Sequence, residues 1–224
     1  MAAYEPAGRK ERKVSIECAS RANGKLMNPA YKQTCFVTSV FERRQLPAEA
    51  VAEAAFAGRS NAGKSSAINA LCEQKRLAQI SKMPGRTRAL NFFAVDAERT
   101  LVDLPGYGYA KAPTALRRQW KTLIEHYLGQ RRNLRGLMLV MDIRHPLTDH
   151  DWQLLDWCQA RGLPLHILLT KADKISRGAA ASTLQKVERS LRERKVDASV
   201  QTFSTLKRQG VEQAHEVLDA WLGF

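Results

Sequence analysis

Several features that mark other classes of protein are missing from this chain. No apolar run approaches the roughly 18 residues needed to cross a bilayer, and the opening MAAYEPAGRKERK has no apolar core after its charges. The four cysteines lie far apart, without a Cys-x-x-Cys pair, and the five histidines lack metal-ligand spacing. We therefore expect a cytoplasmic protein with free thiols, and neither membrane insertion, a disulfide framework nor a zinc ribbon.

Acidic residues are scarce relative to basic ones. The chain has 22 acidic residues against 36 Lys and Arg, a formal charge of +14 and a pI near 10.0. This surplus favours a polyanionic partner such as RNA, DNA or anionic lipid, the alternative being a merely soluble basic protein. With 224 residues and 44% hydrophobic content, the chain fits a single α/β domain with extensions. We expect a mobile basic arm at 1–32 and one domain at 33–224.

The most informative stretch is 52–66, AEAAFAGRSNAGKSS. Its middle reads Gly-x-x-x-x-Gly-Lys-Ser, the phosphate-binding P-loop, between a strand-like run and a helical pattern, which is the context that the motif requires. Glycine at the tight positions lets backbone N–H groups turn inward around a phosphate. The lysine can reach the terminal phosphates and the serine hydroxyl can bind Mg²⁺; a chance match is the alternative. The predicted phosphate-binding residues are Gly58, Arg59, Ser60, Asn61, Ala62, Gly63, Lys64, Ser65 and Ser66.

A second motif follows two β-rich runs, 90–95 and 100–104, which we expect to form a hairpin. An Asp at the C-terminal end of a strand, about 40 residues past a P-loop, can hold Mg²⁺ through water, and a backbone N–H soon after it can sense a γ-phosphate. A simple turn is the alternative, which the position after both the P-loop and a hydrophobic strand disfavours. The predicted residues are Asp103, Leu104, Pro105 and Gly106.

A third motif, Thr-Lys-Ala-Asp at 170–173, follows the apolar run 165–169. That run and 136–141 have the continuous apolar character of parallel strands covered on both faces. A carboxylate at this strand end can accept hydrogen bonds from N1–H and the N2 amino group of guanine, while a Lys stem packs along the purine. A later loop can contact guanine O6 through its backbone. The predicted base-binding residues are Thr170, Lys171, Ala172, Asp173, Ser204 and Thr205.

The other segments connect these motifs. Residues 34–41 read as a strand or a short buried segment, and 75–88 is a basic segment without acids, broken by Pro and Gly, which we expect to be a loop. This loop supplies the candidate binding residues Gly85, Arg86, Thr87 and Arg88. Helical patterns occur at 113–130, 148–161, 179–195 and 210–222, and a last strand is predicted at 199–203.

Together GRSNAGKS, PGRTR, DLPGYG, TKAD and FSTLK resemble the five ordered motifs of a small GTPase, over about 34–222. More narrowly, they resemble the EngB (YihA/YsxC) group of bacterial ribosome-biogenesis GTPases, within the TrmE-Era-EngA superfamily. The resemblance implies an α/β, three-layer, Ras-like fold with a six-stranded, mostly parallel sheet and one antiparallel edge strand. It also implies GTP hydrolysis with Mg²⁺, GTP and GDP as ligands, association with the large ribosomal subunit and its rRNA, and a link to cell division and septation.

The resemblance also assigns roles by position. Ser65 and Thr87 would ligate Mg²⁺, Asp103 would hold it through water, and Lys171 with Asp173 would select guanine. The catalytic residues would be Lys64, Thr87 and Gly106. We expect a monomer.

One residue departs from the Ras pattern. Ras-type enzymes place a Gln after Asp-x-x-Gly to orient the attacking water, and this chain has Tyr107, so unaided hydrolysis should be slow. In cation-dependent relatives an Asn at the position of Asn61 helps bind K⁺ against the phosphates; the alternative is that Asn61 only shapes the loop. Tyr107 and Tyr109 could stack on unpaired bases, although aromatics in such a loop more often pack internally.

Basic residues flank both candidate switch segments, around Thr87 and from Asp103 to about Lys111. Nucleotide state could then place a positive patch against rRNA phosphates, whereas the simpler interpretation is a solvated charged face. A second hypothesis is a module that recruits division or membrane proteins with incidental turnover, and a third is a GTPase of tRNA modification. The basic residues in question are Arg76, Lys82, Arg86, Arg88, Lys111, Arg117, Arg118 and Lys121.

Overall fold

The computed structural model describes residues 28–79, 89–107 and 114–224, with only the helical backbone described for 114–121. Within these ranges the strands are β1 (Cys35–Val40), β2 (Ala52–Gly58), β3 (Leu90–Ala94), β4 (Arg99–Asp103), β5 (Leu134–Asp142), β6 (Leu165–Thr170) and β7 (Ser199–Thr202). The α-helices are α1 (Lys64–Leu71), α2 (Thr114–Gln130), α3 (Asp149–Ala160), α4 (Arg177–Glu193) and α5 (Val211–Leu222). Three short 3₁₀ helices are η1 (Pro29–Gln33), η2 (Arg43–Gln45) and η3 (Ala172–Lys174).

The strands form one sheet in the order β1-β3-β4-β2-β5-β6-β7. Pairing is parallel from β4 through β2, β5 and β6 to β7, while β3 pairs antiparallel with both β1 and β4. The expected mostly parallel fold with one antiparallel edge is therefore confirmed. The described sheet has seven strands rather than six, because β1 adds to the edge beside β3. Three of the six residues of β1 are exposed, as an edge position allows, so it is not a buried segment.

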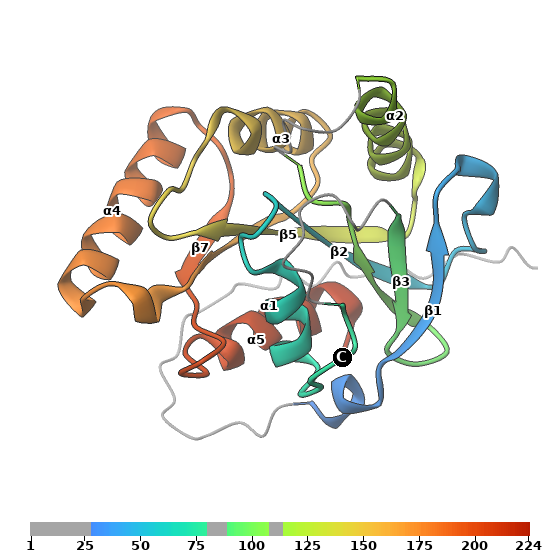
Figure 1. Ribbon diagram of the computed structural model, residues 1–224, viewed down its shortest axis with the longest axis horizontal. Helices are drawn as coiled ribbons and strands as arrows, with labels where there is room; N and C mark the ends of the chain where they lie inside the picture. Colours follow the sequence, from blue (N-terminus) through green and yellow to red (C-terminus); the bar gives the residue numbers. More distant parts are fainter. Residues whose placement is uncertain (1–27, 80–88, 108–113) are drawn as a thin grey trace, which may run out of the picture.

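Helices cover both faces of the sheet (Figure 1). One core joins α2, α3 and α4 to the sheet, and a second joins α1 and α5 to its other face. The central strand β2 is buried along its whole length, as is β6, because both of their faces are covered. The continuous apolar runs of the sequence are thus the middle of a three-layer domain.

A buried ion pair between Arg131 and Glu53 lies at the amino-terminal end of β2. Arg131 Nη2 donates to Glu53 Oε1 at 2.7 Å, and the Tyr127 hydroxyl donates to Glu53 Oε2 at 3.1 Å. Glu53 is the one acid inside an otherwise apolar strand, and Arg131 also donates to the carbonyl of Pro47 at 2.8 Å. The pair therefore joins α2 and the segment before β2 to the centre of the sheet.

The folded part of the chain begins before the boundary that we expected at residue 33. Tyr31 in η1 is fully buried, and its hydroxyl donates to Asp219 Oδ1 on α5 at 3.0 Å. Burial, reinforced by the nearby Asp219 carboxylate, raises the pKa of Tyr31 well above its ordinary value. Residues 28–33 thus belong to the domain, while the rest of the proposed arm lies outside the described residues.

Candidate nucleotide-binding site

The P-loop connects β2 to α1 at the carboxyl edge of the parallel strands. Gly58 must be glycine, because an added Cβ would lie 2.5 Å from the carbonyl oxygen of Val140 on β5. Gly63, the residue that caps α1, has φ +97°, a left-handed conformation that favours glycine. Asn61 between them is also left-handed, with φ 64°. These constraints explain the glycine spacing and direct the first N–H groups of α1 toward the loop, where an anion would bind.

Lys64 and Asp103 meet at this strand edge. The Lys64 ammonium forms an ion pair and hydrogen bond with the Asp103 carboxylate, and both side chains are almost completely buried. The contact brings the first residue of α1 to the last residue of β4, 39 positions apart in the sequence. Ser65 lies half-buried in the same first turn of α1. The structure thus brings the Lys64 cation and the Asp103 carboxylate into contact, with Ser65 in the same turn of α1.

This donor set fits a magnesium ion held together with phosphate. Among residues 28–79, 89–107 and 122–224, no three His, Cys, Asp or Glu side chains gather closely enough to hold a metal by themselves. Mg²⁺ does not require such a cage, because it usually keeps several waters and takes one or two protein oxygens plus substrate phosphates. A Ser hydroxyl and an Asp carboxylate are hard oxygen ligands of the kind it prefers.

Tyr107 lies between the P-loop and α3. Its backbone N–H donates to the Gly58 carbonyl at 3.3 Å, and its carbonyl accepts from the Ser60 N–H at 3.0 Å. Its hydroxyl donates to Asp151 Oδ1 at 2.5 Å, and its ring stacks on His150 with the centroids 6.3 Å apart. The side chain therefore packs internally, against α3, and the alternative that it stacks on unpaired bases does not match this placement.

The partner of Tyr107 is fixed by the start of α3. Asp151 Oδ2 accepts from the backbone N–H of Thr148 at 2.7 Å and from its hydroxyl at 2.8 Å, which forms a capping box. Burial, together with the charge of Asp151, raises the pKa of the Tyr107 phenol well above its ordinary value. The phenol therefore remains a hydrogen-bond donor at neutral pH. This role of Asp151 was not predicted from the sequence, although a Thr three residues before an Asp at a helix start predicts the cap.

The predicted base-binding residues lie on two adjacent loops. Ser204 Oγ donates to Asp173 Oδ1 at 2.6 Å, and this hydrogen bond is the main reason that the pKa of Asp173 lies below its ordinary value. Ser204 itself is fully buried and accepts a hydrogen bond from the backbone N–H of Lys207 at 3.1 Å. The carboxylate of Asp173 is thereby held ionised and oriented, which is what an acceptor for the guanine N1–H and N2 amino group requires.

Lys171 joins the base-binding loop to the P-loop. It has φ 59°, and its Nζ donates to the Asn61 carbonyl at 2.7 Å and to Asp142 Oδ2 at 2.9 Å. Thr170 Oγ1 lies within hydrogen-bond distance of the carbonyl of Ala62, which ties the same two loops together. Asn61 itself is exposed in the loop.

Asp142 is a site residue that was not predicted from the sequence. Although burial opposes it, hydrogen bonds from Arg144 and Lys171 hold the pKa of Asp142 below its usual range. The available signal was its place at the end of the apolar run of β5, beside the strand that leads to Lys171. Several predicted positions lie outside the described residues: Gly85, Arg86, Thr87, Arg88, Tyr109 and Lys111.

Comparisons with known proteins agree with this arrangement. Residues 53–171 match the family model described as 50S ribosome-binding GTPase. Two probable GTP-binding proteins EngB are similar to the chain: one from Aromatoleum aromaticum, 53% identical over 87% of this chain and 90% of the relative, and one from Xylella fastidiosa, 54% identical over 84% and 93%.

Solved structures share the fold. That of a probable GTP-binding protein EngB has a TM-score of 0.62 at 20% identity, covering 76% of this chain and 98% of the other. Era in complex with MgGDPNP and nucleotides 1506–1542 of 16S ribosomal RNA has a TM-score of 0.61 at 19% identity, covering 77% and 57%. With its P-loop, its Lys64–Asp103 pair and its Asp173 loop at one sheet edge, the chain belongs to the EngB family of P-loop GTPases, which hydrolyse GTP.

Proposed function

We propose that this GTPase is a nucleotide-gated switch that acts in assembly of the large ribosomal subunit. The observation that carries the proposal is the position of Tyr107, which bonds to the P-loop through its backbone and to α3 through its hydroxyl. A change at Gly106 on loss of the γ-phosphate would reach α3 through this one residue. A switch needs an element with two arrangements between which the ligand selects, and we infer that the contacts of Tyr107 with the P-loop and α3 are this element.

Within that cycle each site residue has a proposed role. Lys64 would bind the terminal phosphates, Ser65 and Thr87 would ligate Mg²⁺, and Asp103 would hold the ion through water. Bound Mg²⁺ would neutralise charge that develops on the phosphates. Asp173, oriented by Ser204, would read guanine. Tyr107 points toward α3 and has no amide, so it would not orient water as Gln does, and turnover without a partner should be slow.

The ribosomal partner is supported by family and charge. The matching family model is described as 50S ribosome-binding, and the chain has a formal charge of +14, which favours a polyanion such as rRNA. Slow division and failed septation would follow from a shortage of large subunits. Basic residues near both candidate switch segments would contact rRNA phosphates in the GTP state.

Sedimentation with separated ribosomal subunits tests the proposal. The protein is mixed with either subunit in GDP or in a non-hydrolysable GTP analogue, with Thr87→Ala as the switch-defective control. At about 0.3 M salt, which weakens sequence-independent contacts with RNA phosphates, we expect pelleting with the large subunit only, in the analogue state only, and its loss in the variant. Equal pelleting with both subunits in either nucleotide state under these conditions would overturn the proposal.

A potassium ion near Asn61 is a further part of the proposal. Positive charge against the phosphates is what an arginine finger supplies elsewhere, and Asn61 stands exposed at the tip of the P-loop. We expect phosphate release to accelerate when K⁺ replaces Na⁺ at constant ionic strength. If the rate of phosphate release is the same in K⁺ and Na⁺, Asn61 only shapes the loop. The same conclusion follows if K⁺ accelerates phosphate release equally in an Asn61→Ala variant.

A protein-recruitment module is the second candidate. The edge strand β1 favours it, because Phe36 and Val37 expose 54% and 51% of their surface and Phe41 beyond it 50%. Within the described residues no helix is long and apolar enough to span a membrane. In the sedimentation experiment, this candidate predicts no preference for either subunit. It also predicts that the protein binds division proteins and that Phe36→Ser weakens this binding.

A further inference from the structure

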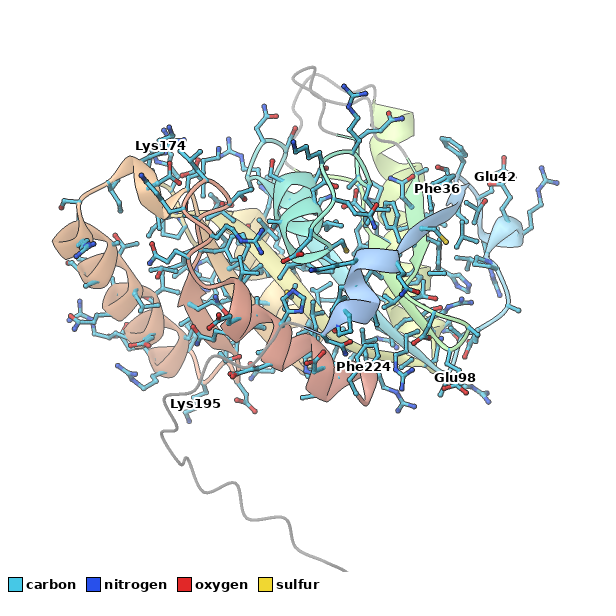
Figure 2. The ribbon with its side chains drawn as sticks, turned by 90° about the horizontal axis from the view of Figure 1, so that it is seen from below. Phe36, Glu42, Glu98, Lys174, Lys195 and Phe224 are labelled. Carbon is cyan, nitrogen blue, oxygen red and sulfur yellow. The ribbon has the colours of Figure 1, made fainter. Side chains whose placement is uncertain are left out.

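The helix α4 concentrates positive charge at the surface. Between residues 174 and 195 there are seven basic side chains and two acidic ones, and all seven basic residues are exposed. Lys174 and Lys195 mark the two ends of this region in Figure 2. We call the set the α4 surface; it consists of Lys174, Arg177, Lys186, Arg189, Arg192, Arg194 and Lys195.

Neighbouring groups leave these charges almost uncompensated. Among the described residues, the only ion pair of the α4 surface joins Lys174 Nζ to Asp173 Oδ2, at 3.7 Å. The Arg194 guanidinium instead lies over the ring of Trp152 on α3, 4.0 Å from its centroid. A cation–π contact holds a guanidinium in place without cancelling its charge. With the two acidic residues of the same segment counted, seven basic minus two acidic residues leave the α4 surface a net charge of +5 toward solvent.

The helix holds these cations in a fixed row. Ala180, Val187 and Leu191 are buried in the core that α4 shares with α2 and α3, so the opposite side faces solvent. Lys186, Arg189 and Arg192 follow one another at helical spacing on that opposite side. These three cations span six residues, about 9 Å at 1.5 Å per residue, and Arg177 lies nine residues before them on the same helix. Such a row matches a long, regular anion better than a single small one.

The helix α5, which packs on the other face of the sheet, carries the opposite sign. Residues 211–222 of α5 contain no Lys or Arg, and their acids are Glu212, Glu216 and Asp219. Both helices are amphipathic and both have an exposed side. If surface charge served solubility alone, the two signs would be more evenly mixed on each helix. The excess of seven basic over two acidic residues between 174 and 195 therefore favours the α4 surface as a binding face.

We propose that the α4 surface binds the phosphate backbone of double-stranded RNA, whichever nucleotide is bound. Four of its seven cations are arginines, whose planar guanidinium groups suit phosphate oxygens. A membrane surface fits less well, because the apolar side chains of α4 point into the core and cannot insert into lipid. We expect the bound nucleotide to have no effect on the affinity of the α4 surface for RNA, because these cations lie on a packed helix outside the two candidate switch segments. The inference rests on the proposed function only in naming RNA as the polyanion.

Binding of a fluorescein-labelled RNA duplex of about 20 base pairs tests this inference. The full-length protein is compared with Lys186→Gln/Arg189→Gln/Arg192→Gln, in GDP and in a GTP analogue. A matched control, Arg43→Gln/Arg132→Gln/Arg135→Gln, removes the same charge from exposed residues elsewhere on the domain. Circular dichroism and GTP turnover without RNA check that both variants are folded and competent.

We expect the α4 variant to bind RNA about 10- to 100-fold more weakly near 0.15 M salt, with a salt slope about 2 to 3 smaller in magnitude. The change should be the same in both nucleotide states, and Arg189→Gln alone should lower the slope by about 1. The matched control should change the affinity by less than about threefold. Equal weakening in both triple variants, binding only with the GTP analogue, or no binding by the unaltered protein would each overturn the inference.

The outcome is separable from that of the proposed function. If the large subunit still pellets the protein only in the analogue state while the α4 variant binds RNA normally, the inference fails and the proposed function stands. If the α4 variant loses RNA binding while subunit pelleting ignores the nucleotide, the proposed function fails and the α4 surface stands.

Discussion

Replacing Tyr107 by Phe should weaken the contact that this residue makes between the nucleotide site and α3. The variant keeps the ring, and hence the stacking on His150, but removes the hydroxyl that donates to Asp151 Oδ1. Asp151 is 2% exposed, so water cannot fully replace the lost donor. Its other oxygen keeps both bonds from Thr148, which limits the penalty. Hydrogen bonds to charged groups contribute about 1.5 to 3 kcal/mol, and we expect the lower end of that range.

Equilibrium unfolding in urea at a fixed, saturating concentration of GDP measures this loss, since bound nucleotide itself contributes to stability. A loss of about 1.5 kcal/mol lowers the melting temperature by roughly 3 to 6 °C in a domain of this size. The matched control is Thr148→Val, which removes a cap bond to Asp151 and leaves the bond from Tyr107 intact.

A double-mutant cycle with Asp151→Ala isolates the contact itself, because alanine has no acceptor for the Tyr107 hydroxyl. We expect a coupling free energy of about 1 kcal/mol or more, and a different value in GDP from that in a GTP analogue if the contact serves the switch. Additive effects of the two substitutions would refute the energetic reasoning. The same coupling in both nucleotide states would reduce the contact to static packing.

Four other substitutions test the site and the fold. Lys64→Ala should abolish productive phosphate binding, measured by calorimetry with GTP, while a retained affinity would contradict its role. Asp173→Asn should move the preference from guanine toward xanthine nucleotides in competition binding, and an undiminished GTP preference would refute the assignment. Arg131→Met leaves the buried Glu53 carboxylate without its cation, so urea unfolding should show a loss of about 3 to 5 kcal/mol. Burial lowers the pKa of His215 below its ordinary 6.5, so its stabilisation is complete above that pH and declines as pH falls; His215→Gln should unfold with less pH dependence between pH 7.5 and 5.5.

The nucleotide site could be located from the sequence because its constraints are local. Gly58 meets the backbone of β5 and Gly63 has a left-handed φ, so both positions are restricted by the loop itself and appear as a motif. The apolar runs of β5 and β6 predict buried parallel strands, whose carboxyl ends must share an edge. Local rules therefore place three motifs together without any knowledge of side-chain contacts.

The contacts between distant side chains could not be predicted in the same way. Tyr107 and Asp151 are 44 positions apart, and nothing in either neighbourhood specifies the other. From the sequence we could say only that Tyr107 stands where Ras-type enzymes have a Gln. Its hydrogen-bond partner on α3, Asp151, is apparent only from the folded structure. The role of Asp142 was missed for the same reason, since it depends on Lys171 reaching back from the next strand.

The packing of α3 and α4 explains how one small domain could combine a switch with a constant anchor. Both helices belong to a single buried core, in which Leu155 of α3 and Val187 of α4 take part, and Arg194 lies over Trp152, the residue after Asp151. Close-packed layers resist small independent movements of their helices. A rearrangement at Tyr107 would therefore move α3 and α4 together as one packed unit more easily than it would change the spacing between them. The contact between Tyr107 and Asp151 can thus change with the nucleotide while the cations of the α4 surface keep their positions on the helix.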